Sequence, residues 1–441
     1  MSSLAGETTA DGPVVARSCR VADVSYRAFL AARDAPGFHW ADPDGLEVSG
    51  AGTAAAVTAS GGDRFEAVRA WADDLFDGVD YDGPEAARPR LLGGFAFFDD
   101  HEAGAPWTGF PAAQFVLPEC QLASVGDETW LTVARAGGDA TAERVERALA
   151  DARGAVESLP AMRPSGPRPG VAATTPTPTR DEWTTGVRDA LARIEAGDLQ
   201  KVVLATALRA DLDGPVDPRD LLERLRQRYS QCFRFLVAPT SEAAFLGATP
   251  ERLATLRDGR VETVALAGSV GRGDSPAADA RLAERLRESD KLRHEQGVVV
   301  DTIARRLEEL GDVEVGDRGV RTLSNIQHLE TPISAAVGED THVLDVVETL
   351  HPTPAVNGLP PAAALDTIRE TETFDRGWYA APVGWFDADG DGTFGVGLRS
   401  AVASGETVTL FAGNGIVADS DPEAEWEEVQ LKYRPVLDEL E

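Results

Sequence analysis

Residues 378–417 have the sequence WYAAPVGWFDADGDGTFGVGLRSAVASGETVTLFAGNGIV. Three runs rich in apolar residues lie within this stretch, at 378–386, 393–402 and 407–417, and turns containing glycine separate them. We expect each run to form a β-strand. Because short strands that follow one another through tight turns usually pair antiparallel, the stretch favours an antiparallel sheet over a doubly wound parallel one.

Helical patterns precede these strands, so we expect the chain to belong to the α+β class. Residues 179–182 (TRDE) fit a capping box, and apolar residues follow at helical spacing from 183 to 194. This predicts a helix that ends near Ala196. The β-branched run 201–208 (KVVLATAL) then predicts a buried strand.

Two further segments have a clear pattern. Residues 281–310 repeat apolar positions at helical spacing, with a break near Ser289. Residues 93–98 (GGFAFF) predict a buried strand in the first third of the chain.

The domain organisation is marked by one composition break. Residues 159–180 (LPAMRPSGPRPGVAATTPTPTR) contain six prolines, which predicts an extended connector. We therefore expect residues 1–158 to form the N-terminal part of the fold and residues 181–441 to carry the chemistry.

The charge of the chain excludes several classes of protein. Its 441 residues carry a formal charge of −32, which disfavours nucleic acid as a partner because phosphates are also negative. The three cysteines lie far apart, so neither a disulfide framework nor a cysteine metal knuckle is expected. The sequence shows no secretory signal and no long apolar run, so we expect a cytoplasmic protein without a membrane partner.

Lysine is almost absent. The 42 basic residues include only three lysines, Lys201, Lys291 and Lys432. A surface rich in carboxylates and poor in lysine suits saturated salt, because the Debye length is about 3 Å at 1 M and charge repulsion is screened. We infer a halophilic cytoplasm. Since a buried lysine can lose its proton and arginine cannot, the three retained lysines are candidates for chemistry.

Two acidic clusters are further candidates, each with a simpler alternative. Glu425, Glu428 and Lys432 lie at positions i, i+3 and i+7 of a predicted helix and so share one face. The alternative is a solvated acidic face. Lys291 and Glu295 are four residues apart, and here the alternative is a surface ion pair.

Nine short segments between residues 197 and 432 carry the most distinctive motifs of the sequence. In order, they are 197–204 (GDLQKVVL), 247–253 (GATPERL), 266–269 (LAGS), 291–295 (KLRHE), 327–329 (QHL), 351–358 (HPTPAVNG), 397–399 (GLR), 411–417 (FAGNGIV) and 425–432 (EWEEVQLK). Together they resemble the chorismate-utilising enzymes, and among these most closely the isochorismate synthase branch. The resemblance implies two lobes of antiparallel sheet packed together with outer helices, and makes 181–441 the chorismate-binding catalytic region.

The resemblance also implies a reaction. Chorismate is a ring dicarboxylate with an allylic hydroxyl, and an isomerase of this branch adds water at C2 while the C4 hydroxyl leaves. Lys201 is implied as the base that activates water, and Glu251 as the acid that protonates the departing hydroxyl. Lys201 can activate water only as a neutral amine, and Glu251 can protonate the hydroxyl only as a protonated carboxyl. Burial therefore has to favour the uncharged form of both groups.

A metal and a substrate clamp are implied in the same way. Glu295 and Glu428 would hold Mg²⁺, with Glu425 binding directly or through water, because Mg²⁺ prefers few oxygen ligands completed by water and substrate. The branch works without a glutamine amidotransferase. Menaquinone synthesis is its natural use here, and a siderophore route, which would have the same active site, is the alternative. The residues implied to bind substrate are Gly268, Ser269, His328, Ala355, Tyr379, Arg399, Gly413 and Lys432.

The sequence departs from the family pattern at a few positions. Thr206 stands where relatives often have arginine, and Leu292 where they often have an acidic residue. Tyr379 is more similar to the branch that makes salicylate, whereas that branch tends to have threonine at the position of Ala355. Salicylate, anthranilate and aminodeoxychorismate synthases therefore remain alternatives, and a non-catalytic acidic protein that binds ions or a partner is the alternative from another class.

The net charge leads to a first prediction. Because the carboxylates repel one another when salt is withdrawn, we expect the melting temperature to fall as KCl is lowered from about 3 M to about 0.1 M. Differential scanning fluorimetry across a KCl series measures this. A melting temperature that stays constant over the series would contradict the halophilic interpretation.

Overall fold

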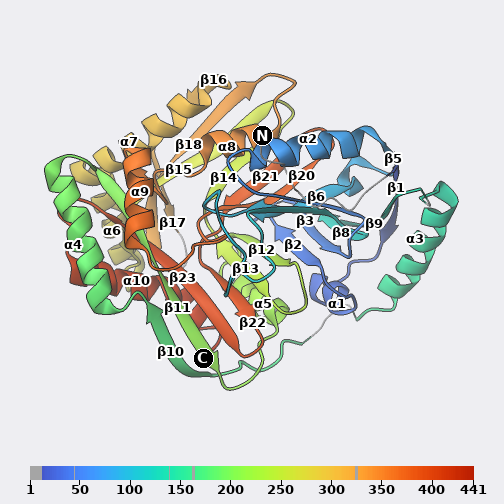
Figure 1. Cartoon of the computed structure of the whole chain (residues 1–441), viewed down its shortest axis with the longest axis horizontal. Helices are drawn as coiled ribbons and strands as arrows, with labels where there is room; N and C mark the ends of the chain where they lie inside the picture. Colours follow the sequence, from blue (N-terminus) through green and yellow to red (C-terminus); the bar gives the residue numbers. More distant parts are fainter. Residues whose placement is uncertain (1–11, 44, 139, 161–163, 323–325) are drawn as a thin grey trace.

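The computed structural model describes residues 12–43, 45–138, 140–160, 164–322 and 326–441. In these ranges the strands form two large sheets, of 13 and 10 strands, and the helices lie on the outside (Figure 1). The pairing is antiparallel, as in β11 with β23, except that β1 and β5 run parallel. The predicted α+β class with two antiparallel lobes is confirmed.

The larger sheet contains strands from both halves of the chain. Its order is β10–β11–β23–β22–β13–β12–β2–β3–β8–β9–β1–β5, and β19 pairs with β11 outside this path. The strands are β10 (Val171–Thr177), β11 (Lys201–Leu212), β23 (Thr407–Ile416), β22 (Ser400–Ser404), β13 (Ala244–Thr249), β12 (Phe233–Ala238), β2 (Gly37–Ala41), β3 (Glu47–Ala51), β8 (Cys120–Val125), β9 (Glu128–Ala136), β1 (Val14–Val21), β5 (Val79–Asp82) and β19 (Gly358–Leu359).

The smaller sheet also combines the two halves. Its order is β16–β18–β15–β14–β21–β20–β6–β7–β4, and β17 pairs with β18. The strands are β16 (Gly311–Val315), β18 (Ile326–Val337), β15 (Arg260–Gly271), β14 (Arg252–Arg257), β21 (Gly392–Val396), β20 (Pro382–Asp387), β6 (Arg90–Phe95), β7 (Ala113–Leu117), β4 (Ala55–Ala59) and β17 (Gly319–Thr322).

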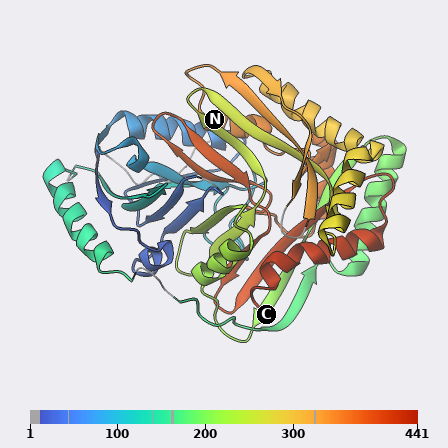
Figure 2. The same cartoon turned by 180° about the vertical axis from the view of Figure 1, so that it is seen from behind.

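The helices pack against the outer sides of these sheets. Seen from behind in Figure 2, α10 lies across β23, and α6 and α7 lie along β15 and β18. The helices are α1 (Tyr26–Ala31), α2 (Arg64–Asp77), the 3₁₀ turn η1 (Glu85–Ala87), α3 (Ala142–Glu157), α4 (Arg180–Ala196), α5 (Pro218–Arg228), α6 (Pro276–Glu288), α7 (Asp290–Leu307), α8 (Val343–Leu350), α9 (Pro361–Thr371) and α10 (Pro422–Leu437).

The elements with strong local signals form as expected. Helix α4 begins after Thr179, whose side chain and that of Glu182 make the predicted capping box, and Gly197 ends it in a left-handed conformation. Strand β11 follows at Lys201. Ser289 separates α6 from α7 at the predicted break, because its hydroxyl caps the second helix.

The limits of three predicted strands were wrong. The run 93–98 overlaps β6, which begins at Arg90 and ends at Phe95. Strand β20 begins at Pro382, not at 378, and the run 393–402 is two strands, β21 and β22, in different sheets. The residues before β20 form a turn, in which Tyr379 N donates to Arg376 O at 2.9 Å and Ala380 has φ of 61°. After β21, Gly397 N donates to Ala381 O at 2.9 Å and Gly397 O accepts from Ala380 N at 3.0 Å, so the chain stays bonded to this turn before it leaves the smaller sheet. Arg399, with φ of 48°, completes the crossing between the sheets.

Sheet pairing joins the two halves of the chain. Strand β2 of the N-terminal half pairs with β12 of the C-terminal half, and one continuous hydrophobic core serves both sheets. Within the predicted connector, β10 pairs with β11 as an edge strand. We keep the boundaries 1–158, 159–180 and 181–441 as a proposal about how the chain is organised.

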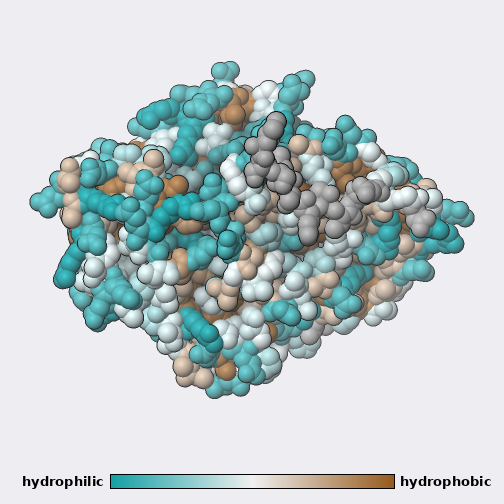
Figure 3. Space-filling view, viewed as in Figure 1, coloured by the Kyte–Doolittle hydropathy of each residue, from teal (hydrophilic) through white to brown (hydrophobic). Residues whose placement is uncertain are grey.

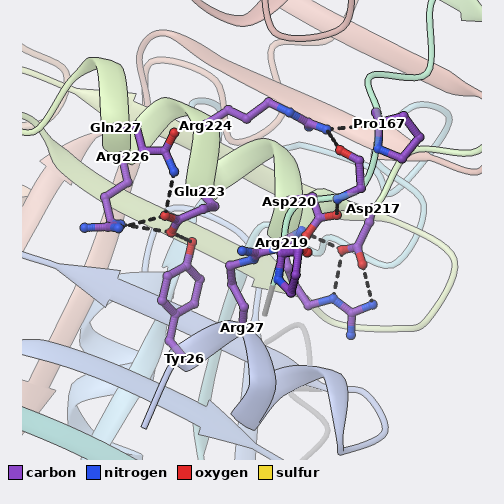
Figure 4. Close-up of polar contacts among 12 residues, drawn as sticks. Tyr26, Arg27, Pro167, Asp217, Arg219, Asp220, Glu223, Arg224, Arg226 and Gln227 are labelled. Atoms are coloured by element: carbon purple, nitrogen blue, oxygen red, sulfur yellow. Dashed lines mark hydrogen bonds and ion pairs between the residues drawn. The ribbon is translucent and has the colours of Figure 1, made fainter. Parts of the chain in front are cut away.

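An ion-pair network fastens the connector to the fold (Figure 4). Asp220 of α5 pairs with Arg27 of α1, and both side chains are almost completely buried. Asp220 also accepts from Gly166 N at 2.7 Å, while Arg224 donates to Gly166 O at 2.9 Å and to Pro167 O at 3.1 Å. Charged side chains of one short helix thus hold two distant segments.

The surface agrees with the acidic composition. Hydrophilic residues spread over the face drawn in Figure 3, and hydrophobic patches on it are small and scattered. In the described part of the chain, no helix combines the length and apolar character needed to cross a bilayer.

The network of α5 gives a stability prediction. Asp220→Ala removes the carboxylate that faces the buried Arg27, so we expect the free energy of unfolding to fall by about 3–5 kcal/mol. Urea unfolding at constant salt measures the change. Arg153→Ala, which breaks an exposed ion pair with Glu157, is the control and should leave the unfolding midpoint unchanged. Equal effects of the two substitutions would contradict the role of the network.

Candidate active site

Lys201 lies at the start of β11 and faces α7. Its Nζ is 3.3 Å from Glu295 Oε1, and 12% of the lysine side chain and 26% of the glutamate side chain are exposed. Gly415 of the neighbouring strand β23 provides the room, because a Cβ there would lie 2.6 Å from Lys201 Cε. Two residues that are 94 positions apart in the sequence therefore meet at a partly buried ion pair.

Glu251 lies in the junction between β13 and β14 and is 9% exposed. Its backbone is held on both sides, by Thr249 Oγ1 at its N–H and by Val396 N at its carbonyl. Burial raises the pKa of Glu251 to about 7, and the charge of Lys201 and the hydroxyl of Thr353 act against this rise. The carboxyl can thus keep a proton near neutral pH and release it to a nearby oxygen.

Tyr379 is on the same side of the site. Its ring is buried and stacks on Phe411 of β23 with 5.4 Å between ring centroids. Burial raises the pKa of the phenol well above its usual range, and the charges of Glu372 and Glu251 add to this effect. Tyr379 therefore stays a neutral hydrogen-bond donor. A Cβ on Gly413 would lie 3.2 Å from its hydroxyl oxygen, so glycine keeps this space open.

Cations gather around His328 of β18. Burial lowers the pKa of His328 to about 3, and the positive charges of Arg399 and Lys432 lower it further, against a backbone hydrogen bond with Gly268. Gly268 has φ of 66° at a register shift of β15. The positive charges of Arg399 and Lys432 reach a buried histidine here, and such a positive potential favours a negatively charged ligand.

Helix α10 supplies a second lysine. Lys432 Nζ donates to Gly413 O at 2.9 Å and to the side-chain oxygen of Asn414, and lies 3.0 Å from Glu428 Oε1. The Asn414 amide group in turn donates to Glu425 Oε2 at 2.9 Å. Asn414 thus connects the helix to β23. Desolvation in this position lowers the pKa of Lys432, and Glu428 opposes the change.

Two of the three predicted metal ligands are paired with lysines. Glu295 pairs with Lys201 and Glu428 with Lys432, and the charge of Lys201 helps to lower the pKa of Lys432. Burial raises the pKa of Glu425, and the neighbouring Glu428 raises it further, so these two carboxylates are close. Within the described residues, however, no three acidic, histidine or cysteine side chains gather tightly enough to form a metal cluster.

The remaining predicted residues have less defined surroundings. Ala355 lies half-buried in the segment between α8 and β19. The side chains of Ser269 and Lys291 lie outside the described part of the structure, although the Ser269 backbone pairs with His328. Two residues differ from the family pattern described above. Thr206 forms a hydrogen bond with the Tyr433 hydroxyl, and Leu292 packs against the position of Gly268.

Sequence reasoning gave no role to several residues that shape the site. Gly415 clears space for Lys201, Asn414 bridges Lys432 and Glu425, and the hydroxyl of Thr353 acts on Glu251. All three lie in quoted motifs. Two glycines on one face of a predicted strand mark a close approach, and this signal could have identified Gly415.

Comparison with known proteins identifies the class. A model of the chorismate binding enzyme family matches residues 4–441, and the chain belongs to this family.

Three relatives show which branch of the family the chain is similar to. The salicylate biosynthesis isochorismate synthase of Pseudomonas aeruginosa is 37% identical over 92% of this chain and 85% of that protein. Isochorismate synthase MenF of Bacillus subtilis is 35% identical over 80% of this chain and 75% of its own length. The solved structure of MenF, the menaquinone-specific isochorismate synthase of Escherichia coli, superposes with a TM-score of 0.83 at 27% identity, over 99% of this chain and 96% of that one.

Glu251 gives a prediction about pH. Because its pKa is about 7 in the folded protein and about 4.3 in the unfolded chain, the folded state gains stability from the proton at low pH. That contribution is complete below about pH 4.3 and is lost as the pH rises through about 7. Glu251→Gln keeps the shape of the side chain and cannot ionise. As the pH rises from about 5 to about 8, its free energy of unfolding should therefore rise by about 2–3 kcal/mol relative to that of the unmutated protein.

Urea unfolding of both proteins at several pH values measures the difference. Glu242→Gln changes an exposed carboxyl and should show no such trend. If the Glu251→Gln and unmutated proteins keep the same stability difference at every pH, the buried carboxyl does not hold its proton as described.

Proposed function

We propose that the protein is an isochorismate synthase that converts chorismate to isochorismate. The observation that carries this is a buried Glu251 whose pKa is about 7 and which feels the charge of Lys201, in a chain that belongs to the chorismate binding enzymes. A base and an acid are what the reaction needs, because water must lose a proton as it adds and the hydroxyl must gain one as it leaves.

Each catalytic residue has one task. Acting as a free amine, Lys201 takes a proton from water, the water oxygen bonds to C2 of the ring, and the double bond shifts as the bond from C4 to its hydroxyl breaks. Glu251 gives its proton to the departing hydroxyl, which leaves as water. A proton passed back from Lys201 to Glu251 through solvent then restores both groups, and product and substrate have the same composition.

The anion site would orient the substrate. Arg399 and Tyr379 would hold the enolpyruvyl carboxylate, and the backbone N–H groups near Gly268, Ser269 and Gly413 would assist, since glycine permits close approach. His328 and Lys432 would line the same site. A dianionic substrate would offset the crowding of positive charge around His328. Ala355 would lie beside the ring.

Mg²⁺ is the proposed cofactor. Carboxylates are the ligands that this ion accepts, and the Glu428 side chain is 48% exposed, so a hydrated ion can reach it. Glu295 and Glu428 would bind it, with Glu425 direct or through water. When bound, it would neutralise the ring carboxylate of chorismate. Lys201 and Lys432 balance two of these carboxylates in the structure described here.

The biological setting is part of the proposal. We propose a cytoplasmic enzyme of a halophile that serves menaquinone synthesis and works without a glutamine amidotransferase. Tyr379, whose pKa is raised in part by the charge of Glu251, favours salicylate synthase as the second candidate, because a phenol at this position resembles the lyase branch. Pyruvate released in proportion to chorismate consumed would identify that branch.

Lys201 gives the first test of the function. Lys201→Ala removes the proposed base and leaves the anion site, so we expect turnover to fall about 10²–10⁴-fold while chorismate still binds. Chromatography of the product measures turnover, and calorimetry measures binding. Arg209→Ala, an exposed position on the same strand, is the control. Residual turnover near the unmutated rate would show that another group activates water.

The metal gives the second test. Glu295→Gln and Glu428→Gln each remove one proposed ligand charge, so we expect Mg²⁺-dependent turnover and calorimetric Mg²⁺ binding both to be lost in a folded protein. Glu427→Gln, an exposed neighbour on α10, should behave as the unmutated protein. Unchanged turnover of the unmutated protein in EDTA would refute the metal.

A further inference from the structure

Strand β11 has a gap along one edge, next to the lysine it carries. On that edge β19 pairs with Lys201 and Val202, and β10 pairs from Ala207 onward. Among the described strands, none covers residues 203–206 on this side. Backbone groups there need other partners, because an unpaired buried N–H or carbonyl is costly.

A buried ion pair fills the gap. Arg376 is completely buried, and its Nη2 donates to Val203 O at 2.8 Å, while Glu372 Oε1 accepts from Ala205 N at 2.7 Å. The two side chains hold each other through two hydrogen bonds, from Nε at 2.8 Å and from Nη2 at 2.5 Å. Together they bind two backbone groups of β11 that a neighbouring strand would otherwise bind.

The same pair reaches the segment that carries Thr353 and Ala355. Arg376 Nη1 donates to Val356 O at 2.9 Å, and the N–H groups of Val356 and Asn357 both return to Thr353 O, which closes a tight turn. One guanidinium therefore bonds both the strand of Lys201 and the turn that carries Thr353, whose hydroxyl lowers the pKa of Glu251.

Tyr379 is tied to the same group. Its N–H donates to Arg376 O at 2.9 Å, and the charges of Arg376 and Glu372 both act on its phenol. The Arg376 guanidinium also lies 4.4 Å from the ring centroid of Phe97, which closes the space behind it. The arginine has no route to solvent and faces the back of the site.

We propose that the Arg376–Glu372 pair is a positioning element of the reaction, which fixes Lys201 relative to Glu251 by fastening β11 to the 353–357 turn. The proposal rests on the function proposed above. Neither side chain touches the substrate. Because a base and an acid act on the two ends of one allylic system, a small displacement between them slows the chemical step more than it weakens binding.

Arg376→Lys is the direct test. Lysine keeps the charge opposite Glu372 but cannot donate to Val203 O and Val356 O together, so the two segments separate without a lone buried charge. We expect kcat to fall at least about tenfold and the KM for chorismate to change less than about threefold. Thermal melting in the assay salt shows whether the variant is folded.

Glu370→Gln is the matched control. It lies two residues before Glu372 and breaks an exposed pair with Arg193, so kcat and KM should both stay unchanged. The double variant Arg376→Gln and Glu372→Gln removes both charges and the bridge, and should show the same loss of kcat at constant KM.

Several outcomes would overturn the proposal. A kcat of Arg376→Lys within about twofold of the unmutated value would do so, as would a loss expressed mainly in KM. Unfolding of both the Arg376→Lys variant and the double variant would show that the pair has a purely structural role. Product analysis of the unmutated protein runs in parallel. A product other than isochorismate rejects the proposed function. The ratio of the kcat values of the variant and the unmutated protein for forming that product still decides the role of the pair.

Discussion

The pairing of β11 with β23 is the constraint on which the site depends. Ten consecutive residue pairs join the strands, from Val202 with Ile416 to Asp211 with Thr407. The register places Val203 opposite Gly415, so the aliphatic part of Lys201 passes where a side chain would otherwise stand. Gly413 and Asn414 of the same strand then bind Lys432, which brings α10 and its carboxylates to the other wall of the site.

Charge is balanced locally in a protein that is strongly acidic overall. Two of the three lysines of the chain lie in the site, each paired with a glutamate, and Arg399 stands nearby. Burial, aided by the nearby positive charges, lowers the pKa of His328, and burial also keeps a proton on Glu251 near neutral pH. The proposed acid and anion clamp thus rest on burial and on the spacing of a few charges, within a chain whose net charge is strongly negative.

Much of this could be predicted from the sequence, for local reasons. The capping box of α4 and the serine at the start of α7 depend on residues within one turn, and the shortage of lysine drew attention to Lys201 and Lys432. Other features depend on contacts between distant segments. The turn before β20 and its hydrogen bonds with Gly397 set the ends of two predicted strands, and no local pattern reveals these contacts.

Glu372 and Arg376 show the same limit more sharply. Their spacing of four residues is that of an ordinary exposed pair on a helix, and distant segments bury them, among them β11, whose Val203 is 173 positions away from Arg376.

The source of the new oxygen tests the central claim most directly. Chorismate is incubated with the protein and Mg²⁺ in water enriched in ¹⁸O, and the product is examined by mass spectrometry. The account predicts isochorismate with one ¹⁸O atom at C2, because a water molecule activated by Lys201 supplies that hydroxyl. A product without the label, or an aminated product when ammonium is present, would contradict it.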